Sequence, residues 1–179
     1  MAAARPLVAA LAAVLVGLGC SSAASSHCPG IDLGGLHLAG ARTAASCTAG
    51  GPANGFDDLY PATLAFDATF AHQAQGDGAA LCLNRPGADP FQGTTAAGAG
   101  GDQLDVAADT TGAVLVKCAA GCAVSVRQTI SGTLTLDPVT RAPTAFSGTL
   151  TEVATAEPLS DCAPCTLPCG ATWALTGAP

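Results

Sequence analysis

The strongest structural signal in the chain is ISGTLTLDPVTRAPTAFSGTLT, residues 130–151. The pentapeptide Ser-Gly-Thr-Leu-Thr occurs in both halves of this segment, and apolar residues alternate with threonine and serine in each half. Alternation with a period of two is typical of a half-buried β-strand, and residues 137–144 between the halves are typical of a turn. We therefore predict an antiparallel hairpin with Leu134, Leu136, Phe146 and Leu150 facing inward and Thr133, Thr135, Thr149 and Thr151 facing outward.

The same period continues through much of the chain after Cys20. It is clear in residues 63–71, where Leu64, Phe66, Ala68 and Phe70 share one face, and in residues 113–118 and 122–126. It is weaker at 36–44, 79–83, 103–108 and 172–176. Residues 84–102 contain two prolines and a Gly/Ala/Thr run, which predicts a long loop. No segment after Cys20 shows the period of about 3.6 residues that indicates a helix. The sequence thus predicts a single all-β domain, an antiparallel β-sandwich or an open meander or barrel, of about seven to nine strands.

Charge excludes one broad class of partner. The chain of 179 residues holds 13 Asp and Glu against 6 Lys and Arg, which gives a formal net charge of −7. Nucleic-acid binding needs clustered Lys and Arg that release counterions from phosphates. We therefore expect no nucleic-acid partner.

Bulky apolar residues are scarce in this chain. The hydrophobic fraction is 49%, but much of it is alanine, which buries little area. Past the first twenty residues, Leu, Ile, Val and Phe make up only about 18% of the chain, near the level at which disorder is expected. The chain also holds 22 Gly and 12 Pro. A domain of this composition needs cross-links for stability, and nine cysteines can supply them in an oxidising compartment.

The N-terminus has the pattern of an export signal. Residues 1–5 carry one positive charge, and residues 6–19 are apolar and uncharged. This stretch is shorter than the roughly 20 residues that a transmembrane helix needs, and its pattern is typical of a secretory signal peptide. We predict a cleaved signal helix over residues 1–19.

The end of this stretch, Leu18-Gly19-Cys20-Ser21-Ser22, resembles the lipobox of bacterial lipoproteins. The resemblance implies that the Cys20 thiol receives a diacylglycerol, that residues 1–19 are removed, and that residues 20–27 form a lipid-anchored tether. Gly17 departs from the family pattern, which usually has Leu there. Ser21 after the cysteine resembles the signal for the outer membrane. The alternative is cleavage after Ala24, which would release a soluble secreted or periplasmic protein.

Eight cysteines remain when Cys20 is set apart, and they belong to the domain predicted over residues 28–179. They are Cys28, Cys47, Cys82, Cys118, Cys122, Cys162, Cys165 and Cys169. An even number in an exported domain predicts disulfides, although on the order of a hundred connectivities are possible for eight cysteines.

Two local cysteine spacings suggest more. Cys118 and Cys122 flank a short Gly-containing segment between two alternating runs, so we expect them to face each other across a hairpin and bond. The C-terminal cysteines are expected to supply at least one long-range bridge to Cys28, Cys47 or Cys82. Cys162 and Cys165 also form a C-x-x-C motif, for which a redox pair and a zinc site are alternatives to structural disulfides.

No catalytic, metal or cofactor motif is present. The three histidines, His27, His37 and His72, lack metal-binding spacing, and no H-E-x-x-H or G-x-S-x-G motif occurs. As a whole the chain resembles small cysteine-rich lipoproteins of high-GC Gram-negative bacteria, which have no assigned function. We expect a non-enzymatic envelope protein at the outer membrane or cell surface, with a structural or binding role, without cofactor or metal, and with the membrane as partner. The alternative is an exported hydrolase with a site in the 84–102 loop near His72.

Overall fold

The computed structural model describes residues 28, 30–47, 60–73, 79–85, 89–114, 118, 121–163 and 165–179. The predicted signal peptide (residues 1–19), Cys20, the predicted tether (residues 20–27) and His27 lie outside the described residues. Eight strands are present: β1 (Ile31–Ala45), β2 (Thr63–Gln73), β3 (Ala79–Asn84), β4 (Phe91–Gly98), β5 (Gly101–Val114), β6 (Ala123–Leu136), β7 (Pro143–Ala156) and β8 (Cys169–Ala178). In this part of the chain we find no helix that is long and apolar enough to cross a membrane.

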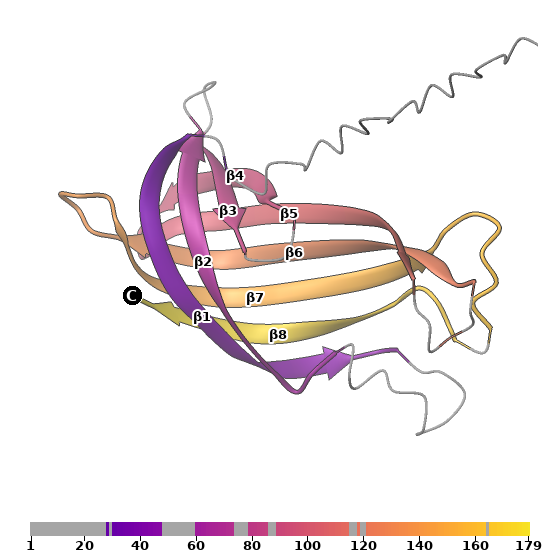
Figure 1. Cartoon of the computed structure of the whole chain (residues 1–179). Coiled ribbons are helices and arrows are strands. Elements are labelled where there is room, and N and C mark those ends of the chain that lie inside the picture. The colour runs from indigo at the N-terminus through magenta and orange to yellow at the C-terminus, as the bar shows by residue number, and fades with distance from the viewer. Residues whose placement is uncertain are drawn as a thin grey trace, which may run out of the picture.

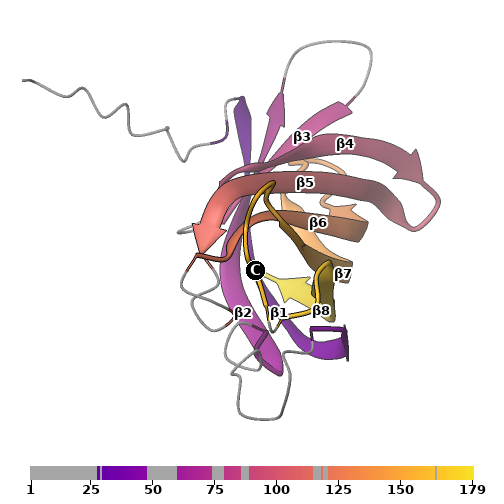
Figure 2. The same cartoon turned by 90° about the vertical axis from the view of Figure 1, so that its right-hand side faces the viewer.

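The strands form one closed antiparallel barrel. Each strand pairs with the next along the chain, and β8 pairs with β1 to complete the ring (Figure 1). Viewed from the right-hand side of Figure 1, the strands surround a common interior (Figure 2). The predicted all-β antiparallel domain is confirmed, and among the forms considered it is the barrel.

The predicted hairpin is the contact between β6 and β7. Leu134 pairs with Phe146, and both are buried, whereas Thr135 on the other face is exposed. At the turn, the Asp137 backbone N–H donates a hydrogen bond to the Ala142 carbonyl at 2.8 Å. The inward and outward faces of this hairpin therefore follow the alternation in the sequence.

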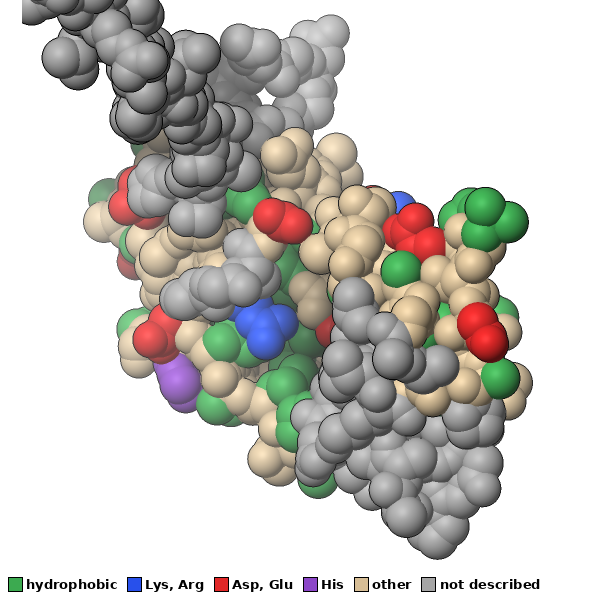
Figure 3. Space-filling view, turned by 45° about the vertical axis from the view of Figure 1, so that its right-hand side comes forward, with side chains coloured by type: hydrophobic (Ala, Val, Ile, Leu, Met, Phe, Trp, Pro, Cys, Tyr) green, Lys and Arg blue, Asp and Glu red, His purple; other side chains and the backbone are tan. Residues whose placement is uncertain are grey.

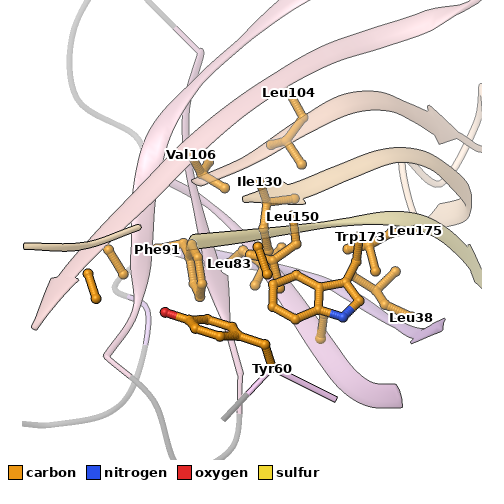
Figure 4. Close-up of a cluster of buried hydrophobic side chains, with 14 of the residues drawn as sticks. Leu38, Tyr60, Leu83, Phe91, Leu104, Val106, Ile130, Leu150, Trp173 and Leu175 are labelled. Carbon is orange, nitrogen blue, oxygen red and sulfur yellow. The ribbon is translucent and has the colours of Figure 1, made fainter. Parts of the chain in front are cut away.

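The barrel interior is filled around Trp173 (Figure 4). Trp173 is 1% exposed, and its indole N–H donates a hydrogen bond of 2.9 Å to the Pro61 carbonyl. The Tyr60 ring packs against it with centroids 5.9 Å apart. Trp173 and Leu175 share the inward face of β8, as the sequence predicts, and the predicted face of β2 around Phe70 also points inward.

Two glycines let a few bulky side chains fill this interior. Gly132 and Gly148 lie opposite each other on β6 and β7. A Cβ added at either position would lie within 3.0 Å of the Phe146 ring and closer still to the facing backbone. The missing side chains leave space that Phe146 occupies. An eight-stranded barrel has an interior just wide enough for such filling, so a modest number of large residues suffices.

The long loop predicted over residues 84–102 is wrong. Residues 91–98 form β4, which pairs with β3 on one side and β5 on the other. A short turn at residues 99–100 joins β4 to β5. The Gly/Ala/Thr run of β4 carries little apolar alternation, and Phe91 is its one bulky buried residue. Pairing on both edges, which no local pattern shows, makes this segment a strand.

Four disulfides join the eight cysteines of the domain. They are Cys28–Cys82, Cys47–Cys169, Cys118–Cys165 and Cys122–Cys162. The expected long-range bridge from the C-terminal cysteines is confirmed by Cys47–Cys169, which spans 122 residues. Four disulfides in a small domain indicate an oxidising compartment.

The predicted Cys118–Cys122 bond is wrong. The β5–β6 pairing ends at Val114 and Ala123, so both cysteines lie in the connection beyond the strands and are not opposite each other in a ladder. Each bonds instead to the connection between β7 and β8. The two cysteines of the C-x-x-C motif accordingly have different partners, and the motif forms neither an internal redox pair nor a thiolate zinc site.

Candidate binding site

The two ends of the barrel differ in how the strands are connected. At the hairpin end lie the short turns 99–100 and 137–142, the start of β1 and the end of β8. At the other end, which we call the disulfide end, the strands are joined by the connections 46–62, 85–90, 115–122 and 157–168, and all of these except 85–90 are longer than the two turns.

The hairpin end holds a cavity of about 410 Å³, which we call the mouth cavity. Its apolar lining comes from Ile31, Leu33, Leu81, Leu134 and Leu136. Its polar lining comes from Asp32, His72, Thr95, Asp102, Thr140 and Arg141. This volume lies within the range of about 300–1,000 Å³ that is usual for small-molecule sites, and a few polar groups over an apolar floor are typical of such sites.

Strand alternation explains why polar side chains gather at this end. Along β5, Leu104 and Asp102 occupy successive inward positions, because they pair with Gly132 and Leu134 of β6. His72 likewise follows Phe70 on the inward face of β2. The buried apolar residues fill the barrel, and on β2 and β5 the next inward position toward the mouth carries a polar side chain, His72 and Asp102. The barrel therefore ends in a cavity with an apolar floor.

An ion pair spans the rim of the mouth cavity. Arg141 Nη2 donates a hydrogen bond of 3.1 Å to Asp102 Oδ2. The Asp102 side chain is only 21% exposed, whereas that of Arg141 is 58% exposed. Because Asp102 is the second residue of β5 and Arg141 lies in the turn after β6, the pair links two neighbouring hairpins and neutralises the more buried charge.

The backbone at Arg141 is in the left-handed region, with φ of 61°. Residues other than glycine, asparagine and aspartate seldom adopt this backbone conformation, which is unfavourable for them by about 1–2 kcal/mol. The turn holds this conformation through Asp137, whose carboxylate accepts hydrogen bonds from the Val139 and Thr140 backbone N–H groups at 2.9 and 2.7 Å. These hydrogen bonds also lower the pKa of Asp137. A strained residue that carries a rim charge is a candidate functional residue.

A second polar group points into the barrel closer to the disulfide end. Glu152 on β7 occupies an inward position, and its carboxylate accepts a hydrogen bond of 2.5 Å from Gln128. Burial raises the pKa of Glu152, although the Gln128 hydrogen bond and the charge of Arg85 oppose that shift. Burial, together with the charge of Glu152, also raises the pKa of Tyr60. A smaller hollow of about 300 Å³ lies beside Glu152, where β1, β7 and β8 meet.

The three histidines have separate positions. His37 lies on the outer wall, where its Nδ1 is 2.8 Å from Asp67 Oδ1, and His72 lines the mouth cavity. His27 is outside the described residues. Among the described residues, no group of three or more His, Cys, Asp or Glu side chains is placed to hold a metal ion.

Sequence reasoning did not identify the ion pair of the mouth. Asp102 stood at the end of a predicted loop and Arg141 in a predicted turn, so neither was weighed as a partner of the other. Counting inward positions from the buried residues Leu104 and Leu134 toward the strand ends would have pointed to Asp102. Arg141 gave no such signal, because its place depends on the conformation of the turn.

Comparison with known proteins returned no relative. No family model, curated protein or solved structure matches the chain. The candidate site therefore rests on geometry and chemistry alone. On the face shown in Figure 3, acidic side chains are spread widely and basic ones are few, in keeping with the acidic composition.

Proposed function

We propose that the protein is an exported binding protein of the cell envelope that holds a small, largely apolar ligand in the mouth cavity. The observation that carries this proposal is the cavity itself, which combines an apolar floor with a rim of polar side chains. Some eight-stranded barrels are filled by side chains and others hold one small ligand; here side chains fill the middle around Trp173 and leave the cavity at the hairpin end. A purely structural role would give no reason to leave this end open.

The location that we propose is the outer membrane or cell surface, with a lipid on Cys20 as the anchor. The four disulfides support an oxidising compartment. Cys20→Ala should abolish labelling by radioactive palmitate in the producing bacterium, with Cys28→Ala as the matched control that keeps the label. Labelling that survives Cys20→Ala would leave the soluble form, cleaved after Ala24, as the better description.

Ligand binding can be measured from within the barrel, because Trp173 is the chain's single tryptophan. A neutral apolar dansyl probe in the mouth cavity should quench Trp173 by energy transfer, and the signal should saturate. Leu136→Glu places a charge on the apolar lining of the cavity and should weaken binding at least about tenfold. Val126→Glu is the matched control, because Val126 is also a half-buried inward residue of β6 but lies toward the disulfide end.

Two outcomes would count against a binding role. Absence of saturable binding by apolar probes would favour a structural role for the barrel. Equal loss of binding in Leu136→Glu and Val126→Glu, with both variants folded by circular dichroism, would place the probe elsewhere.

The alternative of an exported hydrolase keeps one supporting observation, which is that His72 lines the mouth cavity. Against it, no hydrogen bond or ion pair within the described part of the chain joins His72 to a carboxylate that could orient it. Turnover of a p-nitrophenyl ester by the purified protein, abolished in His72→Gln, would support the hydrolase. Hydrolysis no faster than the buffer blank would exclude it for this class of ester.

A further inference from the structure

We propose that the ligand of the mouth cavity is an uncharged single-chain amphiphile, with a hydroxyl as its polar group, taken up from the membrane that carries the protein. This inference rests on the proposed binding function and, for the membrane as source, on the proposed lipid at Cys20. It adds two claims: that the rim disfavours charged head groups, and that the cavity opens toward the lipid surface.

The floor of the cavity selects for an apolar chain. Leu81 and Leu134 are 2% and 0% exposed, and Leu136 and Leu33 add half-buried apolar surface. Such a floor offers no hydrogen-bond partner to a polar group, so a buried polar atom of the ligand would be left unsatisfied. The polar end of the ligand must therefore lie at the rim.

The rim disfavours an anionic head group. Two carboxylates, Asp32 and Asp102, line the cavity, whereas Arg141 supplies the one arginine. The guanidinium of Arg141 already binds Asp102 at 3.1 Å. A ligand carboxylate would have to compete with Asp102 for Arg141 while it faces Asp32. The net charge of −7 adds a long-range repulsion.

A cationic head group is disfavoured by the same ion pair. It would have to approach Asp102 beside the positive charge of Arg141 and give up its hydration on entering the cavity. A hydroxyl can accept a hydrogen bond from Arg141 or donate one to Asp102 without bringing a charge into the site. The ion pair can then stay intact with the ligand bound.

The Cys28–Cys82 disulfide places the entry of the chain at the mouth. Cys28 is 8% exposed and is bonded to Cys82, which follows Leu81 along β3 and packs with Cys28 and Ala71 in a cluster separate from the main core. Three residues after Cys28, Ile31 begins β1 and also lines the cavity. A lipid on Cys20 would lie only eight residues before Cys28, a span of at most about 29 Å. The anchor therefore holds the mouth end close to the lipid surface, which is the richest source of apolar chains.

Head-group preference can be tested with three amphiphiles of equal chain length: dodecanol, dodecylamine and dodecanoate. Each is titrated against the mature protein carrying the neutral dansyl probe, with displacement followed through Trp173. We expect dodecanol to bind most tightly and dodecanoate at least about tenfold more weakly. If dodecanoate or dodecylamine binds as tightly as dodecanol, the head-group claim is wrong although the binding function stands. If the dansyl probe itself does not bind, the proposed function fails.

A charge variant tests the role of the ion pair directly. Asp102→Asn keeps the shape of the side chain and releases Arg141, so dodecanoate should bind at least about tenfold more tightly than it does to the wild type. Asp109→Asn is the matched control: Asp109 also lies on β5 and binds Arg127 at 3.0 Å, but on the outer wall. An unchanged dodecanoate affinity in Asp102→Asn, or an equal rise in Asp109→Asn, would overturn the role assigned to the pair.

Arg141→Gln gives a second, independent variant in case Asp102→Asn does not fold. It leaves Asp102 without its cation, so dodecylamine should gain affinity and dodecanoate should lose it. A change in the opposite direction for either ligand would contradict the charge argument.

The membrane source is tested by the length of the tether. In proteoliposomes that contain the dansyl probe, we compare the wild type with a form carrying twenty Gly/Ser residues inserted between Ser26 and His27. The longer tether lowers the effective concentration of the mouth at the lipid surface, so uptake should slow at least about twofold. An equal rate of uptake, with unchanged affinity in detergent-free solution, would overturn the claim that the mouth faces the membrane.

Discussion

The two ends of the barrel are held in different ways. At the disulfide end, Cys47–Cys169, Cys118–Cys165 and Cys122–Cys162 fasten the long connections between strands. At the hairpin end, Asp137 accepts hydrogen bonds from two backbone N–H groups of the turn at residues 137–142, and the cavity lies open between the turns. The remaining disulfide, Cys28–Cys82, joins the segment before β1 to β3 and does not fasten these turns. Ordering a long connection is entropically unfavourable, and a cross-link reduces that penalty by constraining the unfolded chain. The comparison indicates a covalently fixed end that supports an end free to bind.

Full reduction should have the largest effect on stability. Loss of a native disulfide from a small exported domain destabilises it by about 2–5 kcal/mol, and whole domains are stable by only about 5–15 kcal/mol. Reducing all four bridges should therefore unfold the barrel at 37 °C. Thermal melts by circular dichroism, with thiols counted alongside, check this. A fully reduced protein that keeps its melting temperature would show that the apolar interior suffices without cross-links.

Removing one disulfide at a time should affect stability and ligand binding differently at the two ends of the barrel. Cys47→Ser combined with Cys169→Ser removes the disulfide that closes the longest loop. The chain-entropy model gives this disulfide a stabilisation of about 5 kcal/mol, so stability should fall while ligand affinity stays unchanged. Cys28→Ser combined with Cys82→Ser removes the disulfide that closes a loop of 54 residues, for which the same model gives a stabilisation of about 4 kcal/mol. This double variant should also weaken ligand binding several-fold. Urea melts and probe titrations measure both. Equal effects on binding would mean that the ends are not independent.

Local patterns in the sequence were enough for most of the strands but not for β4 or for the assembly of the barrel. The β6–β7 hairpin was predictable, because alternation and turn chemistry lie within one short segment. Closure of the barrel was not, since β1 and β8 pair across most of the chain and nothing local records that contact. The strand β4 was missed for the same reason. The disulfide partner predicted for Cys118 was wrong because the connection after β5 is longer than the alternating run suggested.

The site was harder to predict than the fold. His72 was considered as part of a candidate site, and it does line the mouth cavity. Asp102 and Arg141 are far apart in sequence, and their contact depends on the pairing of β5 with β6 and on the left-handed turn. Neither feature leaves a pattern in the residues nearby.

Relaxing the turn at the mouth should have a smaller effect. Arg141→Asn puts a residue that tolerates φ of 61° in place of one that does not. The gain of about 1–2 kcal/mol is offset by loss of the ion pair, which contributes about 1 kcal/mol at most. Stability should thus be unchanged or rise by up to about 2 kcal/mol, while the preference for uncharged ligands weakens. A loss of more than about 1 kcal/mol in urea melts would show that Arg141 is retained for stability rather than for binding.

The smallest expected effect is a difference in pH dependence between Glu152 in the barrel interior and Asp137 in the turn of the hairpin end. Burial raises the pKa of Glu152, so the folded state keeps this proton at pH values where the unfolded chain has lost it, and stability falls as pH rises through that window. Hydrogen bonds lower the pKa of Asp137. The stabilisation that its carboxylate contributes to the folded state is therefore present at neutral pH, and it is lost as pH falls through the pKa of the folded state. Glu152→Gln should therefore be more stable than the wild type near about pH 7 and equal to it in acid, because the amide can still accept the hydrogen bond from Gln128. Asp137→Asn should be less stable than the wild type near about pH 7, with the difference vanishing in acid. Melting temperatures of the three proteins across this range measure both slopes, and parallel curves for all of them would mean that neither carboxyl group is coupled to folding.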